Sequence, residues 1–208
     1  MLPKGVILDF DDFREDENSL DYLFRLRAKF PKFKVTLFTI PSKCSTEFLK
    51  AVKEVPWIQM ALHGHEHLPV ECELWKRHEA RTFLQHDFEA GGVKPFVRGF
   101  KAPQWRMSQG TIEACEELGF WVANNAEAGS NPNNCVYPDT LPQYFANGSV
   151  VVPGTHHGGY QREHGHIGCL VTNNDIRQYW HFLLNRIPPE SEFHFIDDVI
   201  RHHYPGRL

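Results

Sequence analysis

The sequence predicts an α/β fold, a distorted (β/α) barrel of about seven strands. Two observations lead to this prediction. Short apolar runs alternate with longer segments of helical periodicity over nearly the whole chain, which is the pattern of a parallel sheet with crossover helices. The length of 208 residues is close to that of a barrel, and neither a repeat nor a linker interrupts the chain. We therefore expect residues 1–208 to form a single domain.

Each expected strand is a short apolar run, and each expected helix carries apolar side chains three or four positions apart. The expected strands are residues 5–10, 35–40, 57–62, 96–100, 120–124, 149–153 and 192–196. The expected helices are residues 20–30, two segments that begin after the N-caps Ser45 and Ser108, residues 74–90, residues 176–187 and a short terminal segment. Residues 127–147 are rich in Asn, Pro and Gly and are expected to form a long loop that serves a site.

The composition excludes several classes of protein. A hydrophobic fraction of 41% with 23% charged residues excludes disorder, collagen and coiled coils. A net charge of −4 predicts no nucleic-acid partner. The chain has no apolar run of membrane-spanning length and no export signal, so we expect no membrane partner and a cytoplasmic location. The five cysteines are scattered without a CxxC pair, which argues against a disulfide framework and a thiolate zinc site. None of these features predicts the oligomeric state.

Acidic and histidine side chains follow two of the expected strands. Asp9, Asp11 and Asp12 end the first strand, where adjacent carboxylates repel one another unless a cation binds them or they lie in a solvated turn. His63 and His67 follow the third strand and share one face if the chain turns helical there. Two histidines, one carboxylate and an open position for water form a recurrent catalytic zinc site. We therefore expect the two histidines, with Asp11 or Asp12, to hold one divalent metal ion.

Two further segments carry polar side chains near the ends of expected strands. Residues 98–106 form a cationic and aromatic proline turn, in which a cation can orient a carboxylate, although such a turn can also simply cover the core. Residues 154–166 are rich in histidine and glycine. One of these histidines can act as a general acid, because histidine is the side chain that titrates near neutral pH without perturbation.

In chain order, these features resemble the polysaccharide deacetylase (NodB-homology, carbohydrate esterase family four) superfamily: paired aspartates after the first strand, His-x-x-x-His after a later strand, an aromatic-cation-x-Pro turn and a late histidine. The resemblance spans the whole chain. It implies that Asp11 is the catalytic base and that Asp12, His63 and His67 bind one divalent metal ion, with zinc as the first choice. The implied fold is a distorted (β/α) barrel. The implied reaction removes an N-acyl group from a carbohydrate or related small-molecule amide, with N-acetyl as the first choice.

The resemblance also implies roles for the later segments. Either Lys101 or Arg98 braces the catalytic base. The histidine that protonates the leaving group falls on His166, with His164 as the second choice and His156 as the third. Substrate contacts are expected from Pro103, Trp105, His156 and His164.

Four positions depart from the family pattern. Phe13 replaces the glycine that follows the paired aspartates, and Gly64 replaces a serine or threonine. Lys101 stands where arginine is usual, and Trp105 follows Gln104 in place of a Tyr-Gly pair. These departures indicate a divergent branch, in which the metal ligands are better supported than the substrate.

Three alternatives remain open. His63-Gly-His65 matches the His-x-His of amidohydrolase-like metal hydrolases, but these place it on the first strand, which here carries carboxylates. His65, His67 and Glu71 match half of a cupin metal motif, but the expected helices contradict that all-β fold. The non-enzymatic alternative is a carbohydrate-binding domain that retains the metal without turnover, and an open coordination position would distinguish the enzyme from it.

Overall fold

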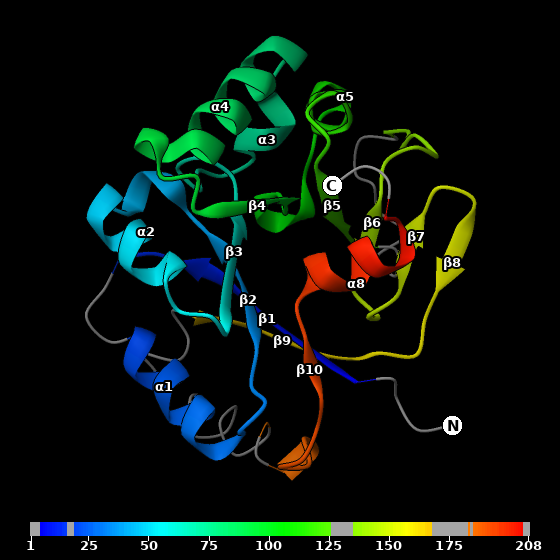
Figure 1. Ribbon diagram of the computed structural model, residues 1–208. Helices are drawn as coiled ribbons and strands as arrows, with labels where there is room; N and C mark the ends of the chain where they lie inside the picture. Colours follow the sequence, from blue (N-terminus) through cyan, green and yellow to red (C-terminus); the bar gives the residue numbers. More distant parts are fainter. Residues whose placement is uncertain (1–4, 16–18, 126–134, 168–182, 184, 206–208) are drawn as a thin grey trace.

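The computed structural model of the chain describes residues 5–15, 19–125, 135–167, 183 and 185–205, and these residues form one mostly parallel sheet with helices around it (Figure 1). The strands are β1 (Val6–Phe13), β2 (Val35–Thr39), β3 (Ile58–Leu62), β4 (Phe96–Phe100), β5 (Trp121–Asn124), β6 (Gln143–Phe145), β7 (Val150–Val152), β8 (Thr155–His157), β9 (Gln161–His166) and β10 (Phe193–His194). Their order in the sheet is β10-β1-β2-β3-β4-β5-β6-β7-β8, and β9 pairs with β1. The pairs from β10 to β6 are parallel, whereas β7 pairs antiparallel with β6 and β8.

Helices connect the first five strands in βαβ fashion. The described helices are α1 (Ser19–Lys29), α2 (Thr46–Lys53), α3 (Glu71–Leu74), α4 (Arg77–Glu89), α5 (Gln109–Glu117) and α8 (Ile196–His203), with 3₁₀ turns η1 (Pro41–Lys43), η2 (Ala90–Gly92) and η3 (Pro103–Trp105). The predicted N-caps are confirmed, because the Ser45 and Ser108 hydroxyls accept hydrogen bonds from the backbone N–H groups of Phe48 and Thr111. None of the described helices is long and apolar enough to cross a membrane.

The α/β architecture is confirmed, with corrections in detail. The structure adds β6, β8 and β9 to the predicted strands, and β6 lies inside the segment expected to be a loop. The helix expected over residues 74–90 is split into α3 and α4, because Trp75 is extended. The helix expected over residues 176–187 lies almost wholly outside the described residues. The pairing of the described strands does not form a closed ring. The four described cysteines are free.

The sheet separates two apolar cores. Phe10 belongs to the outer core between the sheet and the surrounding helices, whereas Ile7, on the opposite face of β1, belongs to the inner core inside the curved sheet. Trp121 fills the centre of the inner core, and a Cβ atom on Gly99 would lie 2.1 Å from its ring, so only glycine fits there. Helix α8 covers the inner core, and the Trp121 Nε1–H donates to the buried Asp197 carboxylate of this helix at 3.0 Å.

The inner face of β1 changes from apolar to acidic along the strand. Ile7 is followed two and four positions later by Asp9 and Asp11, which are buried on the same face. The parallel register pairs Asp9 with His164 and Asp11 with His166 of β9. The fold therefore gathers carboxylates and imidazoles at the carboxyl ends of these strands, where active sites of parallel barrels lie.

Candidate metal and catalytic site

The end of β1 presents two adjacent carboxylates to the same histidine. A regular strand would point neighbouring side chains to opposite faces. Here the register with β2 shifts between Phe10 and Phe13, and Asp12 has a left-handed φ of 64°. As a result, His63 Nε2 lies 4.0 Å from Asp11 Oδ2 and 3.4 Å from Asp12 Oδ1. Phe13 then turns into the outer core, which accounts for the aromatic residue at this position.

Asp12, His63 and His67 form a group that fits a divalent metal ion. Their ligand atoms lie within 4.8 Å of one another, with His67 Nε2 2.9 Å from Asp12 Oδ1. This oxygen is buried and makes no hydrogen bond of regular geometry within the described residues, as expected if oxygen and nitrogens are directed at a common ion. His63 Nδ1 lies 2.9 Å from the Lys101 carbonyl, which requires Nδ1 to donate and leaves the Nε2 lone pair for a metal. The chemistry of the donors suits a zinc-class ion.

The imidazoles around Asp12 also control its charge. Burial alone would raise the pKa of Asp12, but contacts with His166, His63 and His67 hold this pKa well below its ordinary value. In turn, the hydrogen bonds with Asp12 raise the pKa values of His67 and His166, although partial burial opposes the shift. The carboxylate is therefore ionised at neutral pH, as a metal ligand must be.

The loop from His63 to His67 is not the helical turn that the spacing suggested. Gly64 and His67 have left-handed φ values of 68° and 61°. The buried Glu71 carboxylate holds the loop, since its Oε1 accepts from the backbone N–H groups of His65 at 2.9 Å and His67 at 3.1 Å. A Cβ atom on Gly64 would lie 1.9 Å from this oxygen, which explains why glycine replaces the serine or threonine of the family pattern.

His65 points away from the metal ligands. Its Nδ1 lies 2.9 Å from Asp87 Oδ2, a contact that raises the pKa of His65, and its ring stacks on Phe83. His63 and His65 therefore do not form the His-x-His pair that an amidohydrolase-like site requires. The mostly parallel sheet likewise contradicts the cupin alternative.

Of the two cations considered as a brace for Asp11, the structure brings only Lys101 to it. Lys101 Nζ lies 2.5 Å from Asp11 Oδ2 and 3.9 Å from the centre of the Trp105 ring, and the ammonium is fully buried. Burial lowers the pKa of Lys101, partly offset by the charge of Asp11. Arg98 lies on the other face of β4, where it donates to the Leu118 carbonyl and covers the Phe88 ring. The assignment of Arg98 to the site is therefore corrected.

A buried polar network beneath the site was not predicted. Arg162 binds the fully buried Asp9 with two hydrogen bonds of 2.8 Å, and the Tyr144 hydroxyl donates to the same carboxylate at 3.1 Å. His164 Nδ1 lies 2.6 Å from Asp9 Oδ1, and its Nε2 lies 3.5 Å from Asp11 Oδ2. Burial would raise the pKa of Asp9, but Arg162 and His164 hold it well below its ordinary value. An ionised Asp9 thus orients His164 toward Asp11.

The other residues expected at the site divide into two groups. His166 reaches it, with Nδ1 2.9 Å from Asp12 Oδ2 and a side chain that is half exposed. Trp105 is partly exposed beside Lys101, whereas Pro103 is buried next to Gly64. His156 does not reach the site: it is exposed on β8, at the far end of the sheet order, opposite Val151. Its assignment as a substrate contact and as a candidate acid is therefore corrected.

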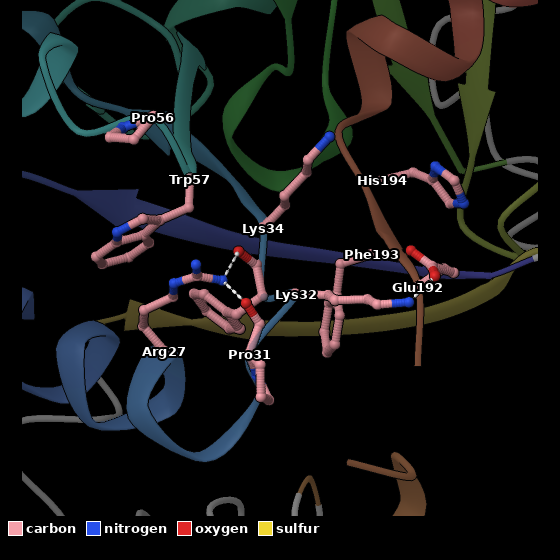
Figure 2. Close-up of a pocket in the computed structure, with 10 residues that line it drawn as sticks. Arg27, Pro31, Lys32, Lys34, Pro56, Trp57, Glu192, Phe193 and His194 are labelled. Atoms are coloured by element: carbon pink, nitrogen blue, oxygen red, sulfur yellow. Dashed lines mark hydrogen bonds and ion pairs between the residues drawn. The ribbon is translucent and has the colours of Figure 1, made fainter. Parts of the chain in front are cut away.

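A cavity of about 420 Å³ lies at the opposite, amino ends of β2, β3 and β10 (Figure 2). Its cationic side chains Arg27 and Lys32 already have hydrogen-bond or ion-pair partners. Arg27 donates to the backbone carbonyls of Pro31 and Phe33, and Lys32 pairs with Glu192. Both side chains of that ion pair are more than half exposed. We assign no catalytic role to this cavity.

Solved structures of low sequence identity share the fold of this chain. The Xyl-CE4 domain of a multidomain xylanase from the hindgut metagenome of Trinervitermes trinervoides is 12% identical, and the match covers 97% of this chain and 91% of that chain with a TM-score of 0.58. A peptidoglycan N-acetylglucosamine deacetylase is 13% identical over 93% of this chain and 86% of that chain, with a TM-score of 0.57. The chain has the fold of the family 4 carbohydrate esterases. The resemblance drawn from the motifs is thus confirmed for the fold.

The esterase fold does not by itself decide activity. A CE4 family pseudoenzyme from Bacillus anthracis is 12% identical to this chain, and the match covers 95% of this chain and 66% of that chain with a TM-score of 0.58. No family model and no curated protein sequence matches the chain. The activity must therefore be argued from the site itself.

Proposed function

We propose that this chain is a metal-dependent hydrolase that removes an N-acyl group from a carbohydrate or related amide. The first choice for this group is N-acetyl. One observation carries the proposal. Asp12, His63 and His67 converge beside Asp11 at the carboxyl ends of the strands. Asp11 in turn accepts a hydrogen bond from the buried Lys101 ammonium. The esterase fold supports the same class of substrate, since one protein that shares it is named as a peptidoglycan N-acetylglucosamine deacetylase.

Asp12, His63 and His67 would hold a zinc-class ion, with zinc the first choice. When bound, such an ion polarises the acyl carbonyl and lowers the pKa of its bound water. Asp12 remains available for this role because its carboxylate is ionised at neutral pH. His63 is held in the tautomer that presents Nε2 by the Lys101 carbonyl.

Asp11 acts as the general base. Its Oδ2 is fixed by Lys101 at 2.5 Å, while its Oδ1 is buried and has no hydrogen bond within the described residues. One oxygen of the carboxylate is thus positioned and the other is free to accept a proton from water. The Lys101 ammonium also keeps a negative charge favourable in this buried place.

His164 is a better candidate for the general acid than His166. Its Nδ1 is held by the ionised Asp9, so Nε2 faces the Asp11 carboxylate and can deliver a proton to the departing amine. His166 is instead half exposed and contacts Asp12, the proposed metal ligand. His166, the first choice for the acid by the family resemblance, is therefore the second candidate in this proposal.

The test of this function is release of acetate from N-acetylated sugar oligomers by protein loaded with one equivalent of zinc. Asp11→Asn is expected to keep the zinc ion held by Asp12, His63 and His67 and to lose at least about two orders of magnitude in activity, the scale expected for removal of a general base. His156→Ala should match the wild type, because His156 lies outside the site. Full activity in Asp11→Asn would reject the base. Zinc binding without acetate release in the wild type would favour a non-catalytic carbohydrate-binding domain.

The choice of acid is tested with the same protein on two leaving groups. His164→Ala should lose more activity on an N-acetyl amide than on an activated acetyl ester, because the ester's leaving group departs without a proton. It should also keep the zinc ion held by Asp12, His63 and His67. His166→Ala is the matched variant, and a selective loss on the amide in that variant alone would restore His166 as the acid.

A further inference from the structure

A second group of ligand atoms lies directly beside the first. Asp11, His164 and His166 each offer one ligand atom, and these atoms lie within 4.8 Å of one another. All three residues come from β1 and β9, whose parallel register pairs Asp11 with His166. Neither histidine belongs to the first group, which takes its histidines from the loop after β3.

We propose that Asp11, His164 and His166 form a second, weaker site for a zinc-class cation, with the Asp12 carboxylate shared between the two sites. The effect of this second ion on catalysis rests on the proposed function, whereas the site itself does not. Imidazole nitrogens favour zinc, copper, nickel or iron over magnesium and calcium, so the class of ligand is a divalent transition-metal or zinc ion.

The orientation of His164 is that of a metal ligand. Its Nδ1 is held by the buried Asp9 carboxylate at 2.6 Å, which leaves the Nε2 lone pair directed at Asp11. A carboxylate on the outer nitrogen is the usual support of a metal-bound histidine. His164 Nε2 and Asp11 Oδ2 are 3.5 Å apart. Two ligands of one tetrahedral zinc ion, each about 2.0–2.2 Å from the metal, lie about 3.4 Å apart.

Asp11 also has an unused oxygen. The residue is only 3% exposed, and its Oδ1 makes no hydrogen bond within the described residues. A buried carboxylate oxygen without a partner is costly, and a cation relieves the cost. This observation is independent of the histidine geometry and points to a ligand of the Asp11 carboxylate.

Asp12 is placed to serve both groups. Its Oδ1 faces His63 and His67, whereas its Oδ2 lies 2.9 Å from His166 Nδ1. A carboxylate with one oxygen toward each group suits a pair of metal ions about 3.5–4 Å apart. Lys101 acts against the second ion, because its ammonium lies 2.5 Å from Asp11 Oδ2. The two sites therefore fill in order, the Asp12 group first.

Filling the second site has a consequence for the proposed reaction. Asp11 and His164 cannot serve as base and acid while they bind a cation. Acetate release should therefore rise as the first equivalent of zinc binds and fall as the second one binds. Excess zinc becomes an inhibitor that acts at the catalytic groups themselves.

The experiment is a zinc titration of chelator-stripped protein by calorimetry, with bound zinc measured after dialysis. The wild type should bind two equivalents, one tight and one weaker. His166→Gln should keep the tight equivalent and weaken the second at least about tenfold, on the scale for loss of one ligand or its support. His164→Gln should do the same, and His156→Gln, an exposed histidine outside both groups, should bind as the wild type does. Folding of each variant is checked by circular dichroism.

Two results would overturn the second site. One is binding of a single equivalent by the wild type. The other is a second equivalent that survives in both His164→Gln and His166→Gln, which would place it elsewhere, for example at the stacked His157 and His203 rings. These readouts do not depend on turnover. Two equivalents, with no acetate release at any point of the titration, would reject the proposed function and retain the site. One equivalent with acetate release would do the reverse.

Discussion

The two ends of the sheet both gather charged side chains, but only one of them leaves charge incompletely paired. At the amino ends, Arg27 and Lys32 are satisfied by backbone carbonyls and by the exposed Glu192, so the cavity there is a solvated surface feature. At the carboxyl ends, Asp11 and Asp12 are enclosed by imidazoles and Lys101, and each retains an oxygen without a regular hydrogen bond. Cavity size and charge therefore do not mark the site. The site is marked instead by buried charged groups that lack a full set of hydrogen-bond partners.

The sharpest way to test this contrast is to remove one lysine from each end. Lys101→Met leaves the Asp11 carboxylate buried without its cation, and loss of one partner of a buried ion pair costs about 3–5 kcal/mol of unfolding free energy. Lys32→Met removes an exposed pair and should leave the denaturation midpoint almost unchanged. Urea denaturation of the metal-free proteins measures both. Equal effects of the two substitutions would abolish the distinction between the two ends.

A second test concerns the support of the metal ligands. Glu71→Ala releases the backbone N–H groups of His65 and His67, so the imidazole of His67 is no longer held in place. We expect zinc affinity to fall about 10–100-fold, the usual effect of removing an outer partner of a ligand. Glu79→Ala is the matched control, since Glu79 also binds a backbone N–H, that of Lys76, but away from the site. Competition with a chromophoric chelator measures the affinity. Unchanged affinity in Glu71→Ala would show that the loop keeps its shape without the carboxylate.

The smallest expected effect is a dependence of stability on pH that zinc reverses. His67 and His166 have pKa values raised above 6.5 by Asp12, so their contribution to stability is complete below about pH 6.5 and is lost as the pH rises through the raised values. The pKa of Asp12 is depressed below 3.8, so its contribution is present above that pH and lost as the pH falls. Metal-free protein should therefore melt at a lower temperature near pH 8 than near pH 6. The stabilisation by added zinc should grow over the same interval, because the metal needs neutral imidazoles. Zinc stabilisation that shrinks as the pH rises would contradict this assignment of the ligands.

Local patterns predicted the parts of the site that a single segment carries. The strands before Asp12 and His63 are apolar runs, and the polar residues that follow them meet because parallel strands end at one edge. The spacing of His63 and His67 identified the pair, although the loop between them is left-handed instead of helical. The choice between Arg98 and Lys101 follows from strand alternation, since Arg98 shares its face with Phe100 of the outer core.

Long-range pairing accounts for what the sequence did not reveal. Strand β9 contains Arg162, Glu163 and His164 and lacks an apolar pattern, so its periodicity gave no signal. Its register against β1 joins residues more than 150 positions apart, and this register alone places Arg162 and His164 on Asp9. The contact of Glu71 with the loop could not be predicted for a related reason. Its carboxylate binds backbone N–H groups, which the sequence does not distinguish from one residue to another.

The proposed hydrolysis depends on a metal ion held by Asp12, His63 and His67. The most direct measurement is a calorimetric zinc titration of chelator-stripped wild type and of the double variant His63→Ala, His67→Ala, with acetate release followed in the same samples. We expect the double variant to lose the tight equivalent and to release no acetate from N-acetylated oligomers, while the wild type becomes active as that equivalent binds. Unchanged tight zinc binding in the double variant, or activity of the wild type in the absence of metal, would contradict this expectation.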